Sequence, residues 1–410
     1  YTVRSYSDDG VSWETTVLTS VSVSGGSTSA PAITFTYADK NNRADCGLGC
    51  QEWAYPRLES VASGWGSTMT YTYGNDGRPS TSWYNWRVEA VEVADGVNAS
   101  PTKTILAYST PCYNDPTAGW CNASSTGELV GYGQVTGTAK DFDGTTTLAI
   151  SVHKFHTDEQ KAGREYEIQN QNAAGTTLSQ TSVTYTVSTS GLPAGGFFTY
   201  ASAAESFLRA ASLDRVNRVE YVYDTTTGNL TREKQFDGVP ALYRETEYEY
   251  VTNTSPSVWI LGTISRRTLK DASGVPLSKQ EFGYDNNLPG IGSPAVGELT
   301  LSRQVDGTQT IDAAYIYDTY GNLTDIHAYK NYGTTGSQPS GAYLTYSMVY
   351  DTTLKTYPTS ATNPLGHTMQ VGYDYGQGLP TSVTDPNNNT TTTAYDGLGR
   401  AIEVTYPGYG

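Results

Sequence analysis

The sequence predicts an all-β fold built from repeated antiparallel β-hairpins. Short segments alternate apolar and polar residues and end at Gly, Asn or Asp, which is the pattern of strands and turns. Tyr is frequent, at 33 residues against 8 Phe, and 42 Gly accompany abundant Thr and Val. One sequence unit also recurs: the pair Tyr373-Asp374 is repeated, 22 residues later, as Tyr395-Asp396. Such self-similarity indicates a repeat architecture, in which stacked units bury faces that one unit could not bury alone.

Residues 1–200 are predicted to form a β-rich region that precedes the clear repeats. Alternating segments such as 17–23 and 69–73 run into turns that contain Gly. Residues 201–218 are predicted to be a connector. Within it, residues 203–211 have helical composition and predict a short helix, although nine residues make a marginal helix without tertiary support.

Residues 219–410 are predicted to be the hairpin-repeat array itself, continuing beyond this segment. From Tyr284 onwards the Tyr-Asp corners are spaced by 33, 33, 23 and 22 residues. We expect each Asp to bond its own backbone and a following Gly to take the left-handed conformation. Tyrosines two residues apart share one strand face and would form cross-strand pairs worth ~0.2–1 kcal/mol each. The predicted corners are Tyr223, Asp224, Tyr284, Asp285, Tyr317, Asp318, Tyr350, Asp351, Tyr373, Asp374, Tyr395 and Asp396.

The charge balance excludes several classes of partner. The net charge is −16, with 25 Lys and Arg against 41 Asp and Glu. A protein that binds the phosphate backbone needs a basic patch, so no nucleic-acid partner is predicted. An anionic membrane surface is disfavoured for the same reason, and the absence of a run of about 18 apolar residues predicts no membrane insertion. The first residue is Tyr, so we expect a segment of a longer polypeptide, with any export signal upstream.

Four cysteines lie in two local groups. Three residues separate Cys46 from Cys50 in a turn-rich loop, and eight residues separate Cys112 from Cys121 in another. The pattern predicts two local disulfides, Cys46–Cys50 and Cys112–Cys121, and therefore an oxidising compartment, although four cysteines permit three pairings. A zinc site with four Cys ligands is the alternative, but these spacings differ from those of zinc ribbons.

No catalytic, cofactor-binding or metal-ligating residue is predicted, and the chain is not expected to be an enzyme. Nucleophile-elbow, Walker A and Rossmann patterns are absent from the sequence. His153 and His156 are three apart and would point to opposite faces of a strand, which disfavours a metal site. The acidic turns leave Ca²⁺ open as a cofactor, but none has the full spacing of a Ca²⁺ loop; residues 141–144 come nearest.

Two further sets of residues are candidates for contact with glycans. Tryptophans can stack on sugars, but packing against Gly-rich turns is the more frequent role of Trp. The tryptophans concerned are Trp65, Trp83, Trp86 and Trp120. Six asparagines fit the N-glycosylation pattern, some of them by chance in a chain rich in Asn and Thr. They are Asn98, Asn122, Asn229, Asn253, Asn322 and Asn389.

The recurrent patterns Y-x-Y-D-x-x-G-N-L and D-P-x-x-x-x-T-x-x-x-Y-D-x-x-G-R resemble the YD repeats of the Rhs family. That family includes bacterial Rhs and polymorphic-toxin proteins, the C components of Tc toxins, and teneurins. The resemblance is clear over residues 219–406 and weaker over the N-terminal half. It implies a β-sheet strip wound into a continuous spiral sheet or hollow shell, which in relatives encloses a cargo domain or presents an adhesive surface. The aspartyl self-cleavage motif and the C-terminal toxin of the best-known members are not seen here, so neither activity is assigned.

The sequence therefore predicts a non-enzymatic, secreted or cell-surface scaffold that encloses or presents a cargo. Its expected partners are other parts of a longer parent chain or a cargo or toxin domain. The alternative is an adhesive or self-assembling fibre that binds glycans or copies of itself through loops and open strand edges.

Overall fold

The computed structural model describes residues 2–8, 11–25, 28–41, 54–75, 86–97, 100–114, 120–121, 128–209, 214–238, 241–397 and 399–408. Every regular element in these residues is a β-strand, and the chain divides into two compact units, Tyr1–Arg218 and Val219–Gly410. The division coincides with the start of the predicted repeat array.

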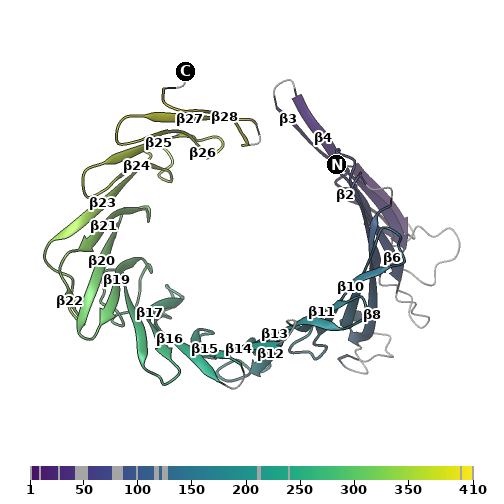
Figure 1. Cartoon of the computed structure of the whole chain (residues 1–410), viewed down its shortest axis with the longest axis horizontal. Helices are drawn as coiled ribbons and strands as arrows, with labels where there is room; N and C mark the ends of the chain where they lie inside the picture. The colour runs from purple at the N-terminus through teal and green to yellow at the C-terminus, as the bar shows by residue number, and fades with distance from the viewer. Residues whose placement is uncertain are drawn as a thin grey trace. The chain divides into compact units, whose positions relative to one another are not determined.

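The first unit is a row of hairpins. Strands β1 and β2 form a two-stranded ladder, and from β3 to β13 each strand pairs antiparallel with the next (Figure 1). The strands are β1 (Thr2–Asp8), β2 (Val11–Val17), β3 (Ser20–Gly25), β4 (Thr28–Asn41), β5 (Ala54–Ala62), β6 (Thr68–Asn75), β7 (Trp86–Ala94), β8 (Thr102–Asn114), β9 (Glu128–Lys140), β10 (Thr147–Phe155), β11 (Glu165–Asn172), β12 (Thr177–Ser188) and β13 (Phe198–Arg209). β14 (Asp214–Tyr223) contains the point of division.

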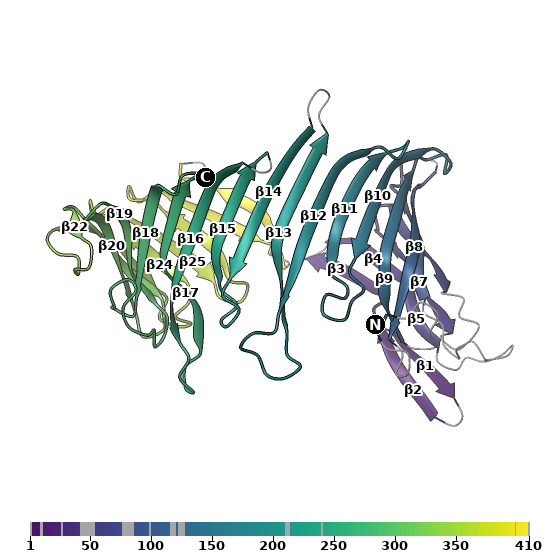
Figure 2. The same ribbon diagram turned by 90° about the horizontal axis from the view of Figure 1, so that it is seen from below.

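The second unit continues the same pattern. Its strands are β15 (Leu230–Asp237), β16 (Leu242–Asn253), β17 (Ile260–Asp271), β18 (Pro276–Tyr284), β19 (Leu299–Asp306), β20 (Gln309–Tyr317), β21 (Leu323–Tyr329), β22 (Gly333–Thr334), β23 (Tyr343–Tyr350), β24 (Pro358–Thr362), β25 (Thr368–Asp374), β26 (Leu379–Thr384), β27 (Thr390–Tyr395) and β28 (Ala401–Thr405). Neighbouring strands pair antiparallel, except that the short β22 returns to β20 while β21 pairs with β23. Figure 2 shows successive strands of each unit lying side by side. The predicted all-β fold of repeated antiparallel hairpins is confirmed.

A β-bulge recurs at the end of the hairpins. Tyr317 faces Leu323 while Ile316 faces Asp325, so Thr324 is an extra residue on the following strand. The Thr324 hydroxyl donates to the Ile316 carbonyl at 3.2 Å. Equivalent bonds join Thr359 to Val349 at 3.1 Å, Ser202 to Thr184 at 3.2 Å and Thr300 to Gly283 at 3.4 Å. The short hydroxyl side chain thus gives the carbonyl beside the bulge a partner.

Few side chains are fully buried, and in the second unit most of them are polar. Leu301 and Val305 of β19 are 3% and 8% exposed, and Arg303 between them is 2% exposed. Burial concentrates here because residues 330–342 fold back over β19 and β20, where the Arg303 guanidinium donates to the Ser337 carbonyl. Cross-strand ladders therefore stabilise the unit more than an apolar core does.

The prediction of a helix at residues 203–211 is wrong for residues 203–209, the part of it that the structure describes. Residues 203–209 belong to β13, which pairs with β12 from Ser179↔Leu208 to Ser188↔Phe198. The helical propensity of Ala is a weak preference, and nine residues are too few for a helix without packing. A neighbouring strand with unpaired backbone groups offers a hydrogen bond at each position of the ladder, and this outweighs the local propensity.

The Gly at each corner turn can be tested by substitution. Gly321 has a φ of 83°, in the left-handed region, whereas Gly262 lies in β17 with open space where a Cβ would be. We expect Gly321→Ala to lower the free energy of unfolding by about 1–2 kcal/mol, because a Cβ clashes in that conformation. Gly262→Ala should stay within about 0.5 kcal/mol of the wild type in the same urea denaturation. Equal effects of the two substitutions would contradict this account.

Candidate functional site: Tyr-Asp corners and polar sheet faces

A tyrosine in the second half of a strand recurrently donates its hydroxyl to a backbone carbonyl within the first half of the preceding strand or, for Leu18, just before it. These hydrogen bonds are 2.7–3.2 Å long and occur in both units. The donor and acceptor pairs are Tyr37 and Leu18, Tyr73 and Leu58, Tyr108 and Val88, Tyr185 and Glu165, Tyr250 and Leu230, Tyr284 and Ile264, Tyr317 and Leu299, Tyr373 and Pro358, and Tyr395 and Pro380. We call each such bond a tyrosine clamp.

Four of the predicted corner tyrosines form clamps, namely Tyr284, Tyr317, Tyr373 and Tyr395. Tyr223 and Tyr350 end β14 and β23. The other five clamp tyrosines, among them Tyr73 and Tyr250, are absent from the predicted corners. Their signal in the sequence is a Tyr at the end of an alternating segment, often two residues after another aromatic residue, as in Tyr71-Thr72-Tyr73.

Burial raises the pKa of several clamp tyrosines. Desolvation is the largest cause at Tyr284, Tyr250 and Tyr317; neighbouring tyrosines add to it at Tyr250, and Glu298 and then Tyr315 add to it at Tyr317. A phenol whose pKa is raised remains a donor at neutral pH, so each clamp holds two adjacent strands together.

The corner aspartates organise the turns that follow the tyrosines. In the Asp318 turn, the carboxylate accepts the backbone N–H groups of Tyr320 at 2.8 Å and Asn322 at 2.9 Å, and the Asn322 amide at 3.0 Å. Asp396 likewise accepts the backbone N–H of Arg400 at 3.0 Å and its guanidinium at 2.7 Å. These are the bonds of a turn-forming residue.

Two corner aspartates hold longer loops. Asp285 accepts the backbone N–H groups of Ala295, Val296, Gly297 and Glu298 at 2.7–3.2 Å, which closes the loop between β18 and β19. Asp351 is 3% exposed, and its carboxylate accepts backbone N–H groups of four residues between β23 and β24. In both loops, one carboxylate accepts several backbone N–H groups that have no carbonyl partner in a strand ladder.

Hydrogen bonding lowers the pKa of these carboxyls. The backbone N–H of Thr226 is the largest cause of the lowered pKa of Asp224, and the Asn389 amide is the largest for Asp385. Burial of Asp285 would raise its pKa, but the N–H groups of its loop together outweigh burial and lower it. At the turn between β9 and β10, bonds from Thr146 and Thr145 lower the pKa of Asp143 to about 2.

The cysteines and histidines form local pairs. Cys112 and Cys121 form a disulfide, with Cα atoms 4.4 Å apart, whereas Cys46 and Cys50 lie outside the described residues. His153 contacts Glu165 at 2.6 Å, and His156 contacts Asp158 at 3.4 Å. Among the described residues, no group of three or more His, Cys, Asp or Glu side chains is placed to hold a metal ion.

The candidate glycan-contacting tryptophans differ in exposure. Trp65 is 80% exposed at the turn between β5 and β6. Trp86 begins β7 under the Lys40 ammonium, which lies 5.3 Å from its ring centroid, and the Trp120 indole donates to the Thr157 carbonyl at 2.8 Å. Trp83 lies outside the described residues. Of the three candidate tryptophans that lie in the described residues, only Trp65 is exposed to this extent.

The described glycosylation candidates use their amide nitrogens within the fold. Asn98 and Asn122 lie outside the described residues. In the other four, the nitrogen that a glycan would modify donates to a protein oxygen at 2.6–3.0 Å. These four are Asn229, Asn253, Asn322 and Asn389.

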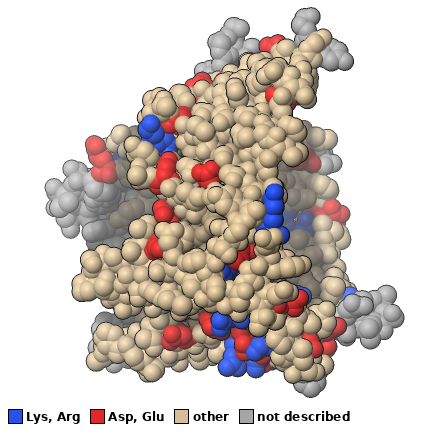
Figure 3. All heavy atoms as spheres, turned by 90° about the vertical axis from the view of Figure 1, so that its left-hand side faces the viewer, with Lys and Arg blue, Asp and Glu red and all other residues tan. Residues whose placement is uncertain are grey.

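Charged side chains form a ladder across β16–β20. Directly opposed residues share a face, and they alternate in sign along Glu249, Arg266, Glu281, Arg303 and Asp312. The ion pairs along this line are 2.8, 3.1 and 3.2 Å for Arg266–Glu249, Arg266–Glu281 and Arg303–Asp312. Figure 3 shows basic and acidic side chains beside one another on one side of the molecule, without a large patch of either sign. The face drawn in Figure 3 therefore shows no large basic patch of the kind that binds a phosphate backbone.

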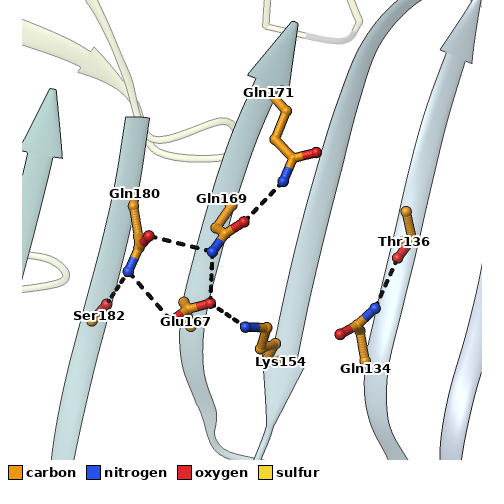
Figure 4. Close-up of polar contacts among 8 residues, drawn as sticks. All are labelled: Gln134, Thr136, Lys154, Glu167, Gln169, Gln171, Gln180 and Ser182. Atoms are coloured by element: carbon orange, nitrogen blue, oxygen red, sulfur yellow. Dashed lines mark hydrogen bonds and ion pairs between the residues drawn. The ribbon is translucent and has the colours of Figure 1, made fainter. Parts of the chain in front are cut away.

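Amide side chains dominate a second polar face, on β9–β12 (Figure 4). Gln171 donates to Gln169, and Gln169 donates to both Glu167 and Gln180 at 2.9–3.3 Å. The Lys154 ammonium lies 2.6 Å from Glu167. The face is thus a connected network of donors and acceptors and contains no nucleophile paired with a base.

The architecture is that of an all-β hairpin-repeat protein, and one segment of the chain matches a known family model. Residues 373–410 match the model of the RHS repeat. Among solved structures, the chain resembles the TcdB2-TccC3-TEV crystal structure, with a TM-score of 0.63 and 11% identity over 91% of this chain and 25% of that one. The TcdB2-TccC3 structure without its hypervariable C-terminal region gives a TM-score of 0.63 and 12% identity over 87% and 24% of the two chains.

The Photorhabdus luminescens Tc holotoxin pore, with a TccC3 variant, gives a TM-score of 0.61 and 11% identity over 91% of this chain and 25% of that one. The chain thus spans about a quarter of the length of these structures. No curated protein matches it. The RHS-repeat match and the likeness of fold support the resemblance to the Rhs/YD-repeat family that the sequence indicates. In the described part of the chain, no helix is long and apolar enough to cross a membrane.

Removing one clamp hydroxyl should destabilise the second unit. Tyr317→Phe keeps the ring but leaves the Leu299 carbonyl without its donor, so we expect the free energy of unfolding to fall by about 0.5–1.5 kcal/mol. Tyr320→Phe is the matched control, because Tyr320 lies two turn residues away from Asp318 and is 66% exposed. Urea denaturation of the three proteins checks this, and a control as unstable as Tyr317→Phe would refute the clamp.

Acid should destabilise the fold through carboxyls that accept the N–H groups of turns, among them Asp224, Asp285 and Asp385. The pKa values of these three are lower in the folded chain than in the unfolded chain, so the unfolded chain binds more protons in the pH range between the two values. Their stabilisation is therefore present above the unfolded pKa of about 4 and is lost as the pH falls through the lowered pKa values of the folded chain. Asp285→Asn should be less stable at pH 7 and should lose less stability on acidification. Urea denaturation from pH 7 to pH 2 checks this, and stability that rises on acidification would contradict it.

Proposed function

We propose that the chain is a wall segment of a longer secreted Rhs/YD-repeat protein, and that the wall encloses or presents a cargo. By wall we mean the paired strands of the two units. The observation that carries this proposal is the repetition of the tyrosine clamp along both units, which locks successive hairpins by the same bond. The fold likeness to TcdB2-TccC3 and the quarter-length coverage support a segment within a larger assembly.

The proposed role is mechanical rather than catalytic. Each clamp joins two neighbouring strands, each bulge hydroxyl caps a carbonyl, and each Asp holds a turn. Opening the sheet at any hairpin therefore breaks several bonds together. Proteases cleave an extended, locally unfolded chain. A wall whose hairpins rarely open locally therefore protects the segments that it encloses from cleavage.

Protease protection of the parent chain tests this proposal. The parent protein that contains residues 1–410 is treated with trypsin. Digestion of its segments outside residues 1–410 is followed by mass spectrometry. We expect protection in the wild type and faster digestion in the triple variant Tyr317→Phe, Tyr373→Phe, Tyr395→Phe. Tyr320→Phe, which leaves every clamp in place, should digest like the wild type.

Enclosure would be overturned if the parts of the parent protein outside residues 1–410 were digested equally fast in the wild type, in the triple variant and as isolated segments. A presented cargo, by contrast, would be digested in all forms while the wall itself stays intact in the wild type.

Adhesion through loop tips is the alternative function. It is favoured by Trp65, which is 80% exposed instead of packed, and by Trp259, which is 72% exposed at the turn before β17. Exposed indole rings at the ends of hairpins are suited to stacking on sugars or to contact with another chain.

A further inference from the structure

A pocket of about 250 Å³ lies in the first unit, between β8, β9 and the loop of residues 156–163 that follows β10. β9 pairs with both β8 and β10, and the three strands lie side by side (Figure 2). The walls include Val130 and Val135 of β9, Phe155 of β10 and Ala162 of the loop. Among the described residues that line the pocket there is no donor or acceptor of a tyrosine clamp, so a role for the pocket goes beyond the proposed wall.

Two glycines leave the space of the pocket open. Gly131 of β9 lies directly opposite Cys112 of β8, and direct partners project from the same face of a sheet. Val135 lies four residues farther along β9 and therefore on that face as well. A Cβ added at Gly131 or at Gly163 would meet no other described atom within 4 Å beyond its chain neighbours. The side-chain space at both positions therefore belongs to the pocket.

Hydrogen bonds fix the loop beside the pocket. The Gly163 N–H donates to the His156 carbonyl at 3.0 Å and so closes the loop. The Thr199 hydroxyl of β13 donates to the Gln160 carbonyl at 2.8 Å, which ties the middle of the loop to the sheet. A wall that is held at its ends and at its middle loses little freedom on binding, so the pocket is organised before a ligand arrives.

A disulfide and an indole fix the β8 side of the pocket. Cys112 is 1% exposed and is bonded to Cys121. The adjacent Trp120 indole donates to the Thr157 carbonyl at 2.8 Å, and the Cys112 sulfur lies 3.4 Å from that same oxygen. The β8 side is thus joined to the loop through Thr157.

The pocket holds water weakly. A confined water molecule needs two to four polar partners. The carbonyl oxygens of His156 and Thr157 already accept hydrogen bonds from within the protein, and the walls between them and β9 are largely apolar. An apolar ligand that displaces weakly held water gains affinity.

The titratable side chains of the lining are uncharged at pH 7. They are Tyr132 and His156, because Cys112 is in the disulfide. Burial, and after it the Lys161 ammonium, lowers the pKa of His156, although the Asp158 carboxylate acts in the opposite direction. The His156 imidazole is therefore neutral, and Lys161 lies 3.9 Å from Asp158.

The Arg87 guanidinium, which reaches Tyr132, is already paired. It donates to the Tyr132 hydroxyl at 2.9 Å and to the Glu89 carboxylate at 3.4 Å, and it lies 5.2 Å from the Tyr108 ring centroid. Burying a charged ligand group without an opposite charge beside it is costly. The pocket therefore favours a neutral ligand.

The volume and the walls select the size and shape of the ligand. A cavity of about 150 Å³ accommodates benzene, whereas drug-sized ligands occupy about 300–1,000 Å³. At about 250 Å³ this pocket fits one ring or two fused rings. The Phe155 ring and the Cys112 sulfur both make favourable contacts with aromatic rings, and the bare peptide of Gly131 offers a flat wall.

We propose that this pocket binds a small neutral aromatic molecule of one or two rings. The ligand ring occupies the space that Gly131 and Gly163 leave open, in contact with Phe155 and the Cys112 sulfur. Bound in this way, it stabilises the folded first unit, because a ligand that binds only the folded chain shifts the folding equilibrium. The wall segment would then carry a small-molecule site in addition to its mechanical role.

Calorimetric titration of the 410-residue chain at pH 7 with four probes tests the proposal. We expect indole and phenol to bind. Cyclohexanol, which matches phenol in size but has no aromatic ring, should bind about three- to tenfold more weakly than phenol. Benzoate, which is charged, should bind about tenfold more weakly or worse. Equal binding of phenol and cyclohexanol, tighter binding of benzoate than of phenol, or no binding of indole and phenol would overturn the proposal.

Substitutions that fill the pocket locate the site. Gly131→Leu should weaken indole binding by about tenfold or more, because the new side chain occupies the pocket. Ala162→Leu narrows the same pocket from the loop and should also weaken binding, which keeps the test valid if Gly131→Leu does not fold. Gly262→Leu, at a β17 position where a Cβ also has open space, is the matched control and should bind like the wild type.

Circular dichroism establishes which variants are folded. Unchanged indole binding in folded Gly131→Leu or Ala162→Leu would place the molecule elsewhere and contradict the proposal, as would an equal loss of binding in folded Gly262→Leu.

Discussion

The hydrogen bond from a tyrosine hydroxyl to a carbonyl of the preceding strand is the interaction on which the rest of this structure depends. A sheet made only of hairpins must turn at each strand end, and there the regular ladder stops and backbone groups need other partners. The tyrosine supplies a donor from a rigid ring, the bulge hydroxyl supplies a second, and the Asp accepts the N–H groups of the turn. Tyr317, Thr324 and Asp318 show all three at one corner, within a few residues of each other.

Because the corner satisfies the backbone, the strand faces between corners are free to differ. On β16–β20 they hold alternating charges, and on β9–β12 they hold amides. Farther along, hydroxyl pairs take their place, with Thr362 and Thr368 at 2.8 Å and Thr384 and Thr390 at 2.8 Å. Each arrangement satisfies its own polar groups locally, so one hairpin plan can carry several kinds of surface.

Local features of the structure could be predicted from the sequence, and features that depend on register could not. Alternation and the Tyr-Asp-Gly spacing are local, so they predicted the hairpins and the turn-forming role of Asp318. The acceptor of the Tyr185 hydroxyl lies 20 residues upstream, and nothing near Tyr185 specifies Glu165. The same limit explains residues 203–209, whose composition favours a helix while pairing with β12 makes a strand. The burial of Arg303 and Asp312 likewise depends on the return of residues 330–342 over β19 and β20, which no pattern in those two strands announces.

A corner of this kind also explains how the fold persists at low sequence identity. The chain matches the TcdB2-TccC3 fold at a TM-score of 0.63 with 11% identity. A fold held by an apolar core requires complementary volumes at many positions, and changes at one position constrain others. Here the recurrent features are a Tyr that donates to a carbonyl, an Asp or Gly in the turn and, at several corners, a short hydroxyl residue in the bulge, all of which act on backbone atoms that every sequence shares. Side chains between corners have only to alternate and to satisfy their own polar groups, so most positions can change while the corners and the strand order remain.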